Sequence, residues 1–255
     1  AKAKVIYQCT ACGGQSNKWA GQCADCNAWN TLEESIASVA PANPKAAARH
    51  AGYAGQESKI ERLADVTITS TSRMPTGNAE LDRVLGGGLV PGSVTLIGGD
   101  PGVGKSTLLV QVLAAMTSDT GSLYVTGEES LQQVKLRAER LSLKADNMQL
   151  LAETGVERIV SIGREKHFPV MVIDSIQTIY SDQLQAAPGS VSQVRESAAQ
   201  LVRFAKQTGV ALLIVGHVTK DGQLAGPRVL EHMVDTVLYF EGEAGNRLRM
   251  IRSVK

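Results

Sequence analysis

Eight consecutive residues match the phosphate-binding pattern Gly-x-x-x-x-Gly-Lys-[Ser/Thr] at every fixed position: Gly99, Asp100, Pro101, Gly102, Val103, Gly104, Lys105 and Ser106. Glycines let the backbone turn its N–H groups onto phosphate oxygens, and a helix N-terminus favours anions. Lys105 is expected to reach the β- and γ-phosphates, and the Ser106 hydroxyl to bind Mg²⁺. The pattern predicts a site for a nucleoside triphosphate that extends to Thr107.

The segments on either side of this loop have the character that the motif requires. Residues 93–98 read as a short buried strand, and residues 107–116 read as a buried helix. The alternative is a chance match on a glycine-rich surface turn. The strand–loop–helix context argues against that alternative.

Carboxylates follow two further predicted strands. Asp174 ends the apolar strand 169–174, where a phosphate-loop enzyme holds Mg²⁺ through water. Glu128 and Glu129 follow the strand 123–126, and we expect Glu128 to act as the base that activates water, with Glu129 supporting it. The structural alternatives are a strand-terminal aspartate and two glutamates that complement the dipole of the helix 131–141.

A polar cluster and two long loops are expected at the same edge of the sheet. His217 directly follows the strand 210–216, and we expect it to contact a γ-phosphate. The alternative is a histidine at a strand end whose hydrogen bonds are satisfied within the protein. Segments 175–190 and 220–227 follow strand ends, and loops of this length are usually functional. Lys220 and Arg228 have the charge to meet a nucleic-acid backbone, the alternative being a solvated surface loop.

All four cysteines lie near the N-terminus in two Cys-x-x-Cys pairs, Cys9 with Cys12 and Cys23 with Cys26. Four thiolates suit tetrahedral Zn²⁺, and a closed shell makes the site structural. Iron in the same site and two disulfides are the alternatives. Trp19 and Trp29 are expected to pack this module, with base stacking as the other interpretation.

Composition narrows the class of protein. The chain has 255 residues, of which 43% are hydrophobic and 4% aromatic, so a large aliphatic core is expected. The formal net charge of +1 gives no global basic field, so any nucleic-acid binding depends on local loops. The chain shows neither an apolar run long enough to cross a membrane nor a signal peptide, and we expect a cytoplasmic protein without a membrane partner.

Three regions separate along the chain. Residues 1–34 form the predicted zinc module, residues 35–60 read as an Ala-, Pro-, Gly- and Ser-rich linker, and residues 61–255 alternate strands and helices. Continuous apolar strands between helices predict an α/β fold with a mostly parallel sheet buried on both faces. The final segments, 234–240 and 247–251, are expected to form a hairpin.

These motifs together resemble the bacterial RadA (Sms) family of RecA-like ATPases of DNA repair and recombination. The residues that carry the resemblance are the four-cysteine knuckle, the segment 85–92, the phosphate loop, the segment 126–130 and the segment 216–222. Scaffold or signalling ATPases of the KaiC-like type share the phosphate loop and the glutamates but lack this combination. A KaiC-like nucleotide-gated protein without DNA binding is the alternative function.

The resemblance implies a RecA-type core that forms a hexameric ring with ATP between subunits. It implies ATP hydrolysis, single-stranded DNA binding, and branch migration of branched recombination intermediates together with a RecA-like recombinase. The loops after Asp174 and His217 match the two that line the DNA channel. In the family, Lys-Asn-Arg-Phe-Gly and a Lon-protease-like domain follow the core. This sequence ends at Lys255, which matches the first residue of that motif, so we expect nucleotide binding and no peptidase function.

Overall fold

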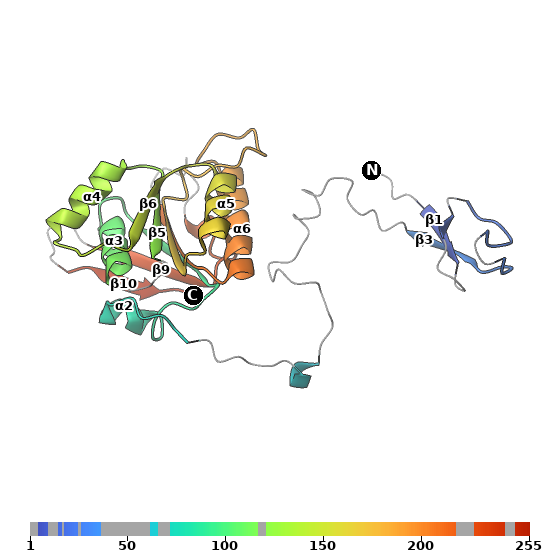
Figure 1. Cartoon of the computed structure of the whole chain (residues 1–255), viewed down its shortest axis with the longest axis horizontal. Helices are drawn as coiled ribbons and strands as arrows, with labels where there is room; N and C mark the ends of the chain where they lie inside the picture. Colours follow the sequence, from blue (N-terminus) through green and yellow to red (C-terminus); the bar gives the residue numbers. More distant parts are fainter. Residues whose placement is uncertain are drawn as a thin grey trace. The chain divides into compact units, whose positions relative to one another are not determined.

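The computed structural model describes residues 5–9, 15–16, 18–24, 27–36, 62–65, 72–116, 121–217, 227–242 and 248–255. The chain divides into two compact units, residues 1–51 and residues 52–255 (Figure 1). The predicted linker, residues 35–60, lies outside the described residues from residue 37 onward. Among the helices that are described, none combines the length and the apolar character needed to cross a bilayer.

The N-terminal unit contains a three-stranded antiparallel sheet in the order β2-β1-β3. Its strands are β1 (Val5–Cys9), β2 (Gln15–Ser16) and β3 (Leu32–Ile36). Cys23 and Leu32 are buried, and Tyr7 packs against them. Trp19 and Trp29 are instead 59% and 70% exposed, so the packing role expected for the two tryptophans is wrong. The small core of this unit consists of Cys23, Leu32 and Tyr7, and neither indole ring belongs to it.

The second unit follows the predicted alternation of strands and helices. Its strands are β4 (Val94–Gly99), β5 (Ser122–Thr126), β6 (Met148–Ala152), β7 (Val170–Asp174), β8 (Ala211–His217), β9 (Thr236–Glu241) and β10 (Met250–Ser253). Its helices are α2 (Ala79–Val84), α3 (Lys105–Ala115), α4 (Leu131–Arg140), α5 (Val156–Lys166) and α6 (Val191–Thr208), with short 3₁₀ turns η1 (Leu63–Asp65) and η2 (Pro227–Val229). The helix after the phosphate loop begins at Lys105, two residues earlier than expected, so Lys105 and Ser106 form its first turn.

The seven strands form one sheet in the order β10-β9-β4-β8-β7-β5-β6. Every neighbouring pair is parallel except β9 and β10, which form the expected antiparallel hairpin. The predicted α/β fold with a mostly parallel sheet is confirmed. Because β4, β8, β7 and β5 are parallel neighbours, their carboxyl ends lie at one edge, with Gly99 beside His217 and Thr126 beside Asp174.

Helices cover both faces of this sheet (Figure 1). Alternate residues of β7 belong to two separate cores: Met171 and Ile173 pack with α5 and α6, whereas Val170 and Val172 pack with α3 and α4. Strands buried on both faces read as continuous apolar runs, which is why they were predicted well. The sheet is therefore a rigid platform for the side chains at its carboxyl edge.

Local signals set the ends of these helices. Ser130 caps α4 in a capping box with Gln133, and Ser190 caps α6. Gly209 ends α6 in the left-handed conformation that glycine adopts without steric cost. These caps satisfy backbone groups that would otherwise lack partners at helix ends.

Candidate nucleotide-binding site

The phosphate loop joins β4 to α3, and its glycines have backbone angles that other residues rarely adopt. Gly99 has a φ of 153°, and a Cβ there would lie 2.3 Å from the carbonyl oxygen of Phe240 on β9. Gly104, the N-cap of α3, has a φ of 114°. Gly102 has a φ of 77°, and no atom lies within 4 Å of a Cβ built there. The loop is thus packed tightly against β9 at one end and open at Gly102, as a phosphate cradle requires.

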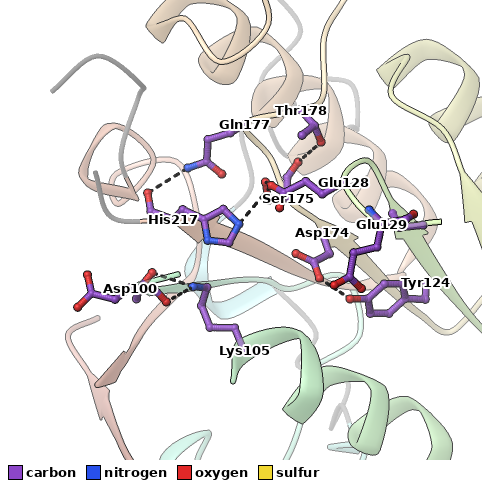
Figure 2. Close-up of polar contacts among 12 residues, drawn as sticks. Asp100, Lys105, Tyr124, Glu128, Glu129, Asp174, Ser175, Gln177, Thr178 and His217 are labelled. Carbon is purple, nitrogen blue, oxygen red and sulfur yellow. Dashed lines mark hydrogen bonds and ion pairs between the residues drawn. The ribbon is translucent and has the colours of Figure 1, made fainter. Parts of the chain in front are cut away.

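Lys105 is held inside this loop. Its side chain is buried, and Nζ donates to the carbonyl oxygens of Gly99 and Asp100, each at 2.8 Å (Figure 2). Burial lowers the pKa of Lys105, and the carboxylates of Asp174, Asp100 and Glu128 oppose this shift. A buried ammonium held only by loop carbonyls fits a nearby anion such as a β- or γ-phosphate. The residues present therefore fit a nucleotide.

Asp174 lies at the carboxyl end of β7 and is buried. Its Oδ2 atom accepts a hydrogen bond from the hydroxyl of Tyr124 on β5 (Figure 2). Its backbone carbonyl accepts from the amide of Gly127 at 2.8 Å. A Cβ on Gly127 would lie 2.0 Å from the Thr178 Oγ1 atom, so only glycine fits between β5 and the turn after β7. Asp174 and the residues that lead to Glu128 are therefore held together as one unit.

Glu128 and His217 face each other across the edge of the sheet (Figure 2). The Oε1 atom of Glu128 lies 3.2 Å from Nε2 of His217 and accepts a hydrogen bond from the Ser175 hydroxyl. The contact with His217 is the main cause that lowers the pKa of Glu128, Ser175 adds to it, and partial burial opposes it. Both ring nitrogens of His217, Nδ1 and Nε2, are buried without a partner of full hydrogen-bond geometry among the residues that the structure describes, so the approach of Nε2 to Oε1 is a close polar contact.

Glu129 turns away from Glu128. Its carboxylate pairs with the Arg137 guanidinium on α4, and this pair is largely buried. The expected support of Glu128 by Glu129 is therefore wrong, because the Glu129 carboxylate is engaged with Arg137. The alternative, in which Glu129 has a structural role beside the helix that follows it, is closer to what the structure shows. Its partner is the Arg137 side chain, however, and not the helix dipole.

Four residues near the site were not predicted from the sequence: Tyr124, Arg137, Ser175 and Gln177. Gln177 donates from Nε2 to the carbonyl of His217 at 3.2 Å, so the turn after β7 supports the end of β8. Tyr124 is a polar aromatic residue inside an otherwise apolar strand, and that was a usable signal, since a buried tyrosine hydroxyl needs a partner. Nothing in the local sequence distinguished Ser175 or Arg137.

Of the two predicted DNA loops, the structure describes all of residues 175–190 and only the last residue of 220–227. In the loop 175–190, the side chain of the buried Gln193 binds the backbone of Ser181, Leu184 and Ala186 and so ties the loop to the first turn of α6. Lys220 and most of the second loop lie outside the described residues. Arg228 lies in η2 and is exposed, and its side chain contacts the Tyr239 hydroxyl.

The cysteines are described in part. Cys23 is buried, and its amide donates to the carbonyl of Ala28 at 2.9 Å in a tight turn that passes through Asn27, whose φ is 56°. Cys9 ends β1, whereas Cys12 and Cys26 lie outside the described residues. A tight turn that closes a Cys-x-x-Cys pair is the local geometry that a metal knuckle requires.

Comparisons with known proteins agree with this geometry. Residues 57–223 match the family model described as an AAA domain, and residues 7–34 match that of a rubredoxin metal binding domain. The chain belongs to the AAA domain family. The resemblance to bacterial RadA proteins is also confirmed by curated relatives that match the chain over its whole length.

The curated relatives that the chain matches include the DNA repair proteins RadA of three bacteria. The protein of Pseudomonas aeruginosa is 60% identical over 255 residues, which cover 100% of this chain and 55% of the relative. That of Escherichia coli is 51% identical over 254 residues, or 99% and 55% of the two chains. That of Bacillus subtilis is 50% identical over 256 residues, or 100% and 56%. This RadA homologue thus spans about 55% of the length of the curated relatives it matches.

Proposed function

We propose that this chain is the ATP-hydrolysing part of a DNA-dependent motor of recombinational DNA repair. The observation that carries the proposal is the set of side chains at one sheet edge, where the Glu128–His217 pair faces the buried Lys105 of the phosphate loop. The name of the relatives, DNA repair proteins, supports the biological role. The preference for adenine over guanine rests on the family resemblance.

The geometry supports a division of labour in phosphoryl transfer. Lys105 binds the β- and γ-phosphates, and Ser106 and Asp174 are the residues that hold Mg²⁺. A Mg²⁺ ion held there would supply positive charge that offsets the charge developing on the transferred phosphate. Glu128 orients the attacking water and accepts its proton, because its carboxylate follows β5 at the sheet edge that faces the phosphate loop. Glu129 has no part in this chemistry.

His217 is the residue that senses the γ-phosphate. In the structure its Nε2 atom is engaged with Glu128. A γ-phosphate offers a stronger acceptor for the same ring, and its arrival would release the Glu128 carboxylate toward water. Since His217 is the last residue of β8, a change in its position is transmitted directly to the chain that continues to Lys220.

DNA contacts are assigned to the two loops beyond β7 and β8. Lys220 and Arg228 supply the phosphate-neutralising charge, and the loop 175–190, fixed by Gln193, supplies polar and backbone groups. In the proposal these loops line the channel of a hexameric ring that holds ATP between subunits. The ring acts on single-stranded DNA and branched intermediates beside a RecA-like recombinase.

The N-terminal unit is proposed to hold one structural Zn²⁺ through Cys9, Cys12, Cys23 and Cys26. The match to a rubredoxin-type metal binding domain and the tight turn at Cys23 support this assignment. A core made of so few residues leaves the metal as the main source of folding free energy.

ATP hydrolysis measured with and without single-stranded DNA tests the proposal, together with DNA-binding anisotropy at two salt concentrations. We expect nucleotide-dependent, salt-sensitive binding that raises turnover. Turnover without DNA binding in any nucleotide state, in the full-length protein as well, would favour the KaiC-like signalling alternative. The absence of nucleotide binding would remove both functions.

A further inference from the structure

Tyr124 is a fully buried polar residue that the proposed mechanism does not use. It lies in the middle of β5, and its neighbours Leu123 and Val125 point into the core beneath α5 and α6. Tyr124 points to the opposite face, toward α3 and α4. Its side chain therefore extends under the first turn of α3, where the phosphate loop ends.

The Tyr124 hydroxyl joins two residues that come from separate elements. It donates a hydrogen bond to Oδ2 of Asp174 on β7 (Figure 2), and the Ser106 side chain on α3 lies within hydrogen-bonding reach of it. A tyrosine hydroxyl is protonated at neutral pH, so it is the donor in its bond to Asp174. Ser106 and Asp174 are the two residues that the proposed function assigns to magnesium.

A charged pair lies behind this bridge. Arg137 of α4 is close enough that Tyr124 and Asp174 both raise the pKa of its guanidinium, after its pairing with Glu129. The Arg137 Nη1 and Glu129 Oε2 atoms are buried without a hydrogen-bond partner among the described residues. The Arg137 guanidinium thus lies near the Tyr124–Asp174 bond, and Glu129 balances its charge.

We propose that Tyr124 is a positioning residue for the magnesium ion of the nucleotide complex. Its hydroxyl fixes Ser106 and Asp174 at one mutual spacing and orients the Asp174 carboxylate so that Oδ1 is left for the ion or its water. Residues that orient metal ligands through hydrogen bonds set metal affinity almost as strongly as the ligands do. The inference rests on the proposed function, because it concerns the same site.

The test measures divalent-ion affinity, with Mn²⁺ as the probe in place of Mg²⁺. Loss of the free Mn²⁺ signal in electron paramagnetic resonance gives the dissociation constant in the presence of ADP. We expect Tyr124→Phe to weaken Mn²⁺ binding about tenfold. ADP binding measured in EDTA should stay within about twofold of the wild type, because the Lys105 contacts with phosphate do not involve Tyr124.

Two further variants make the result specific. Tyr239→Phe is the matched control, since it removes a tyrosine hydroxyl that donates to Glu231 at 2.9 Å and should leave Mn²⁺ affinity unchanged. In an Asp174→Asn background, Tyr124→Phe should cost much less than in the wild type, because the two side chains act through one bond.

These measurements distinguish a failure of the Tyr124 role from a failure of the proposed function. Unchanged Mn²⁺ affinity in Tyr124→Phe would overturn the positioning role, and so would an equal loss of ADP binding in EDTA, which marks a purely structural residue. Wild-type protein that binds no ADP, or binds it without any effect of Mn²⁺, would overturn the proposed function itself.

Discussion

Glu128 Oε1 lies 3.2 Å from His217 Nε2, and this contact joins the ends of β5 and β8, two strands separated in the sheet by β7. Ser175, which follows β7, donates to the same carboxylate oxygen. The three elements beyond the phosphate loop thus converge on a single carboxylate. In this arrangement the Glu128 carboxylate is held by Ser175 and His217, and the proposed function requires that it be released for hydrolysis.

Replacing Glu128 with glutamine should separate nucleotide binding from turnover. The amide keeps the size of the side chain but cannot accept a proton, so we expect turnover to fall by about 10²- to 10⁴-fold while ATP still binds. Phosphate release and equilibrium binding of a fluorescent ATP analogue measure the two effects. Glu129→Gln is a matched control for charge, and its smaller effect on turnover would show that only one of the adjacent glutamates is the base.

Lys105→Ala should abolish turnover and leave the fold intact. We expect a loss of at least about a hundredfold in turnover, since the variant lacks the cation that stabilises charge on the transferred phosphate. The free energy of unfolding should not fall sharply, because the buried ammonium is itself costly to desolvate. Lys144→Ala, at an exposed position, is the control. Turnover at the wild-type rate in Lys105→Ala would contradict the assignment of this loop as the phosphate-binding site.

The pH dependence of stability should report the Glu128 contacts. Because the folded-state pKa of Glu128 lies below its ordinary value of 4.5, its carboxylate stabilises the fold above that value. The contribution is lost as the pH falls through the depressed pKa. Urea unfolding should therefore show the wild type to be more stable than Glu128→Gln at neutral pH, with the difference closing below pH 4.5. A difference that persists at acid pH would assign the effect to packing.

Gly127→Ala should destabilise the second unit by about 1–3 kcal/mol. The added Cβ would meet Oγ1 of Thr178 at 2.0 Å and Cβ of Thr178 at 2.9 Å, so the turn after β7 must shift. Gly155→Ala is the matched control, because the nearest atom to its Cβ is 3.6 Å away. Chemical denaturation measures both variants. Equal stability of the two would contradict the close packing of β5 on this turn.

Removal of metal should unfold the N-terminal unit and leave the second unit folded. Slow displacement with a thiol reagent is expected to release about one zinc ion per chain, in step with modification of the four cysteines. Both tryptophans lie within this unit, so tryptophan anisotropy reports its order alone. Release of iron, or no release of metal, would favour one of the other interpretations of the cysteine pairs.

The sequence was most informative where function depends on a short local pattern. The phosphate loop, the apolar strand ending at Asp174 and the polar end of β8 at His217 were each predicted from consecutive residues. Because parallel strands end at one edge, their proximity followed from the fold class. Pairings between distant side chains did not follow. Glu128 and Glu129 are adjacent and chemically alike, and only the positions of His217 and Arg137 in space separate their roles.

The contacts of Tyr124 and the exposure of the two tryptophans could not be predicted from the sequence, because both depend on the tertiary structure. A tyrosine within an apolar strand indicates a buried hydroxyl, but its partners, Ser106 and Asp174, come from other elements and depend on how β5 faces α3. Trp19 and Trp29 were expected to be buried because large aromatic residues usually are. In a module whose small core is Cys23 with Leu32 and Tyr7, both remain exposed.

The most direct test of the central claim is the rate of ATP hydrolysis by the wild type and by Glu128→Gln, each with and without single-stranded DNA. The account predicts that DNA raises turnover in the wild type and has no effect on the low rate of the variant, although both bind DNA when ATP is present. Hydrolysis by Glu128→Gln at the wild-type rate, with the same response to DNA, would contradict the account.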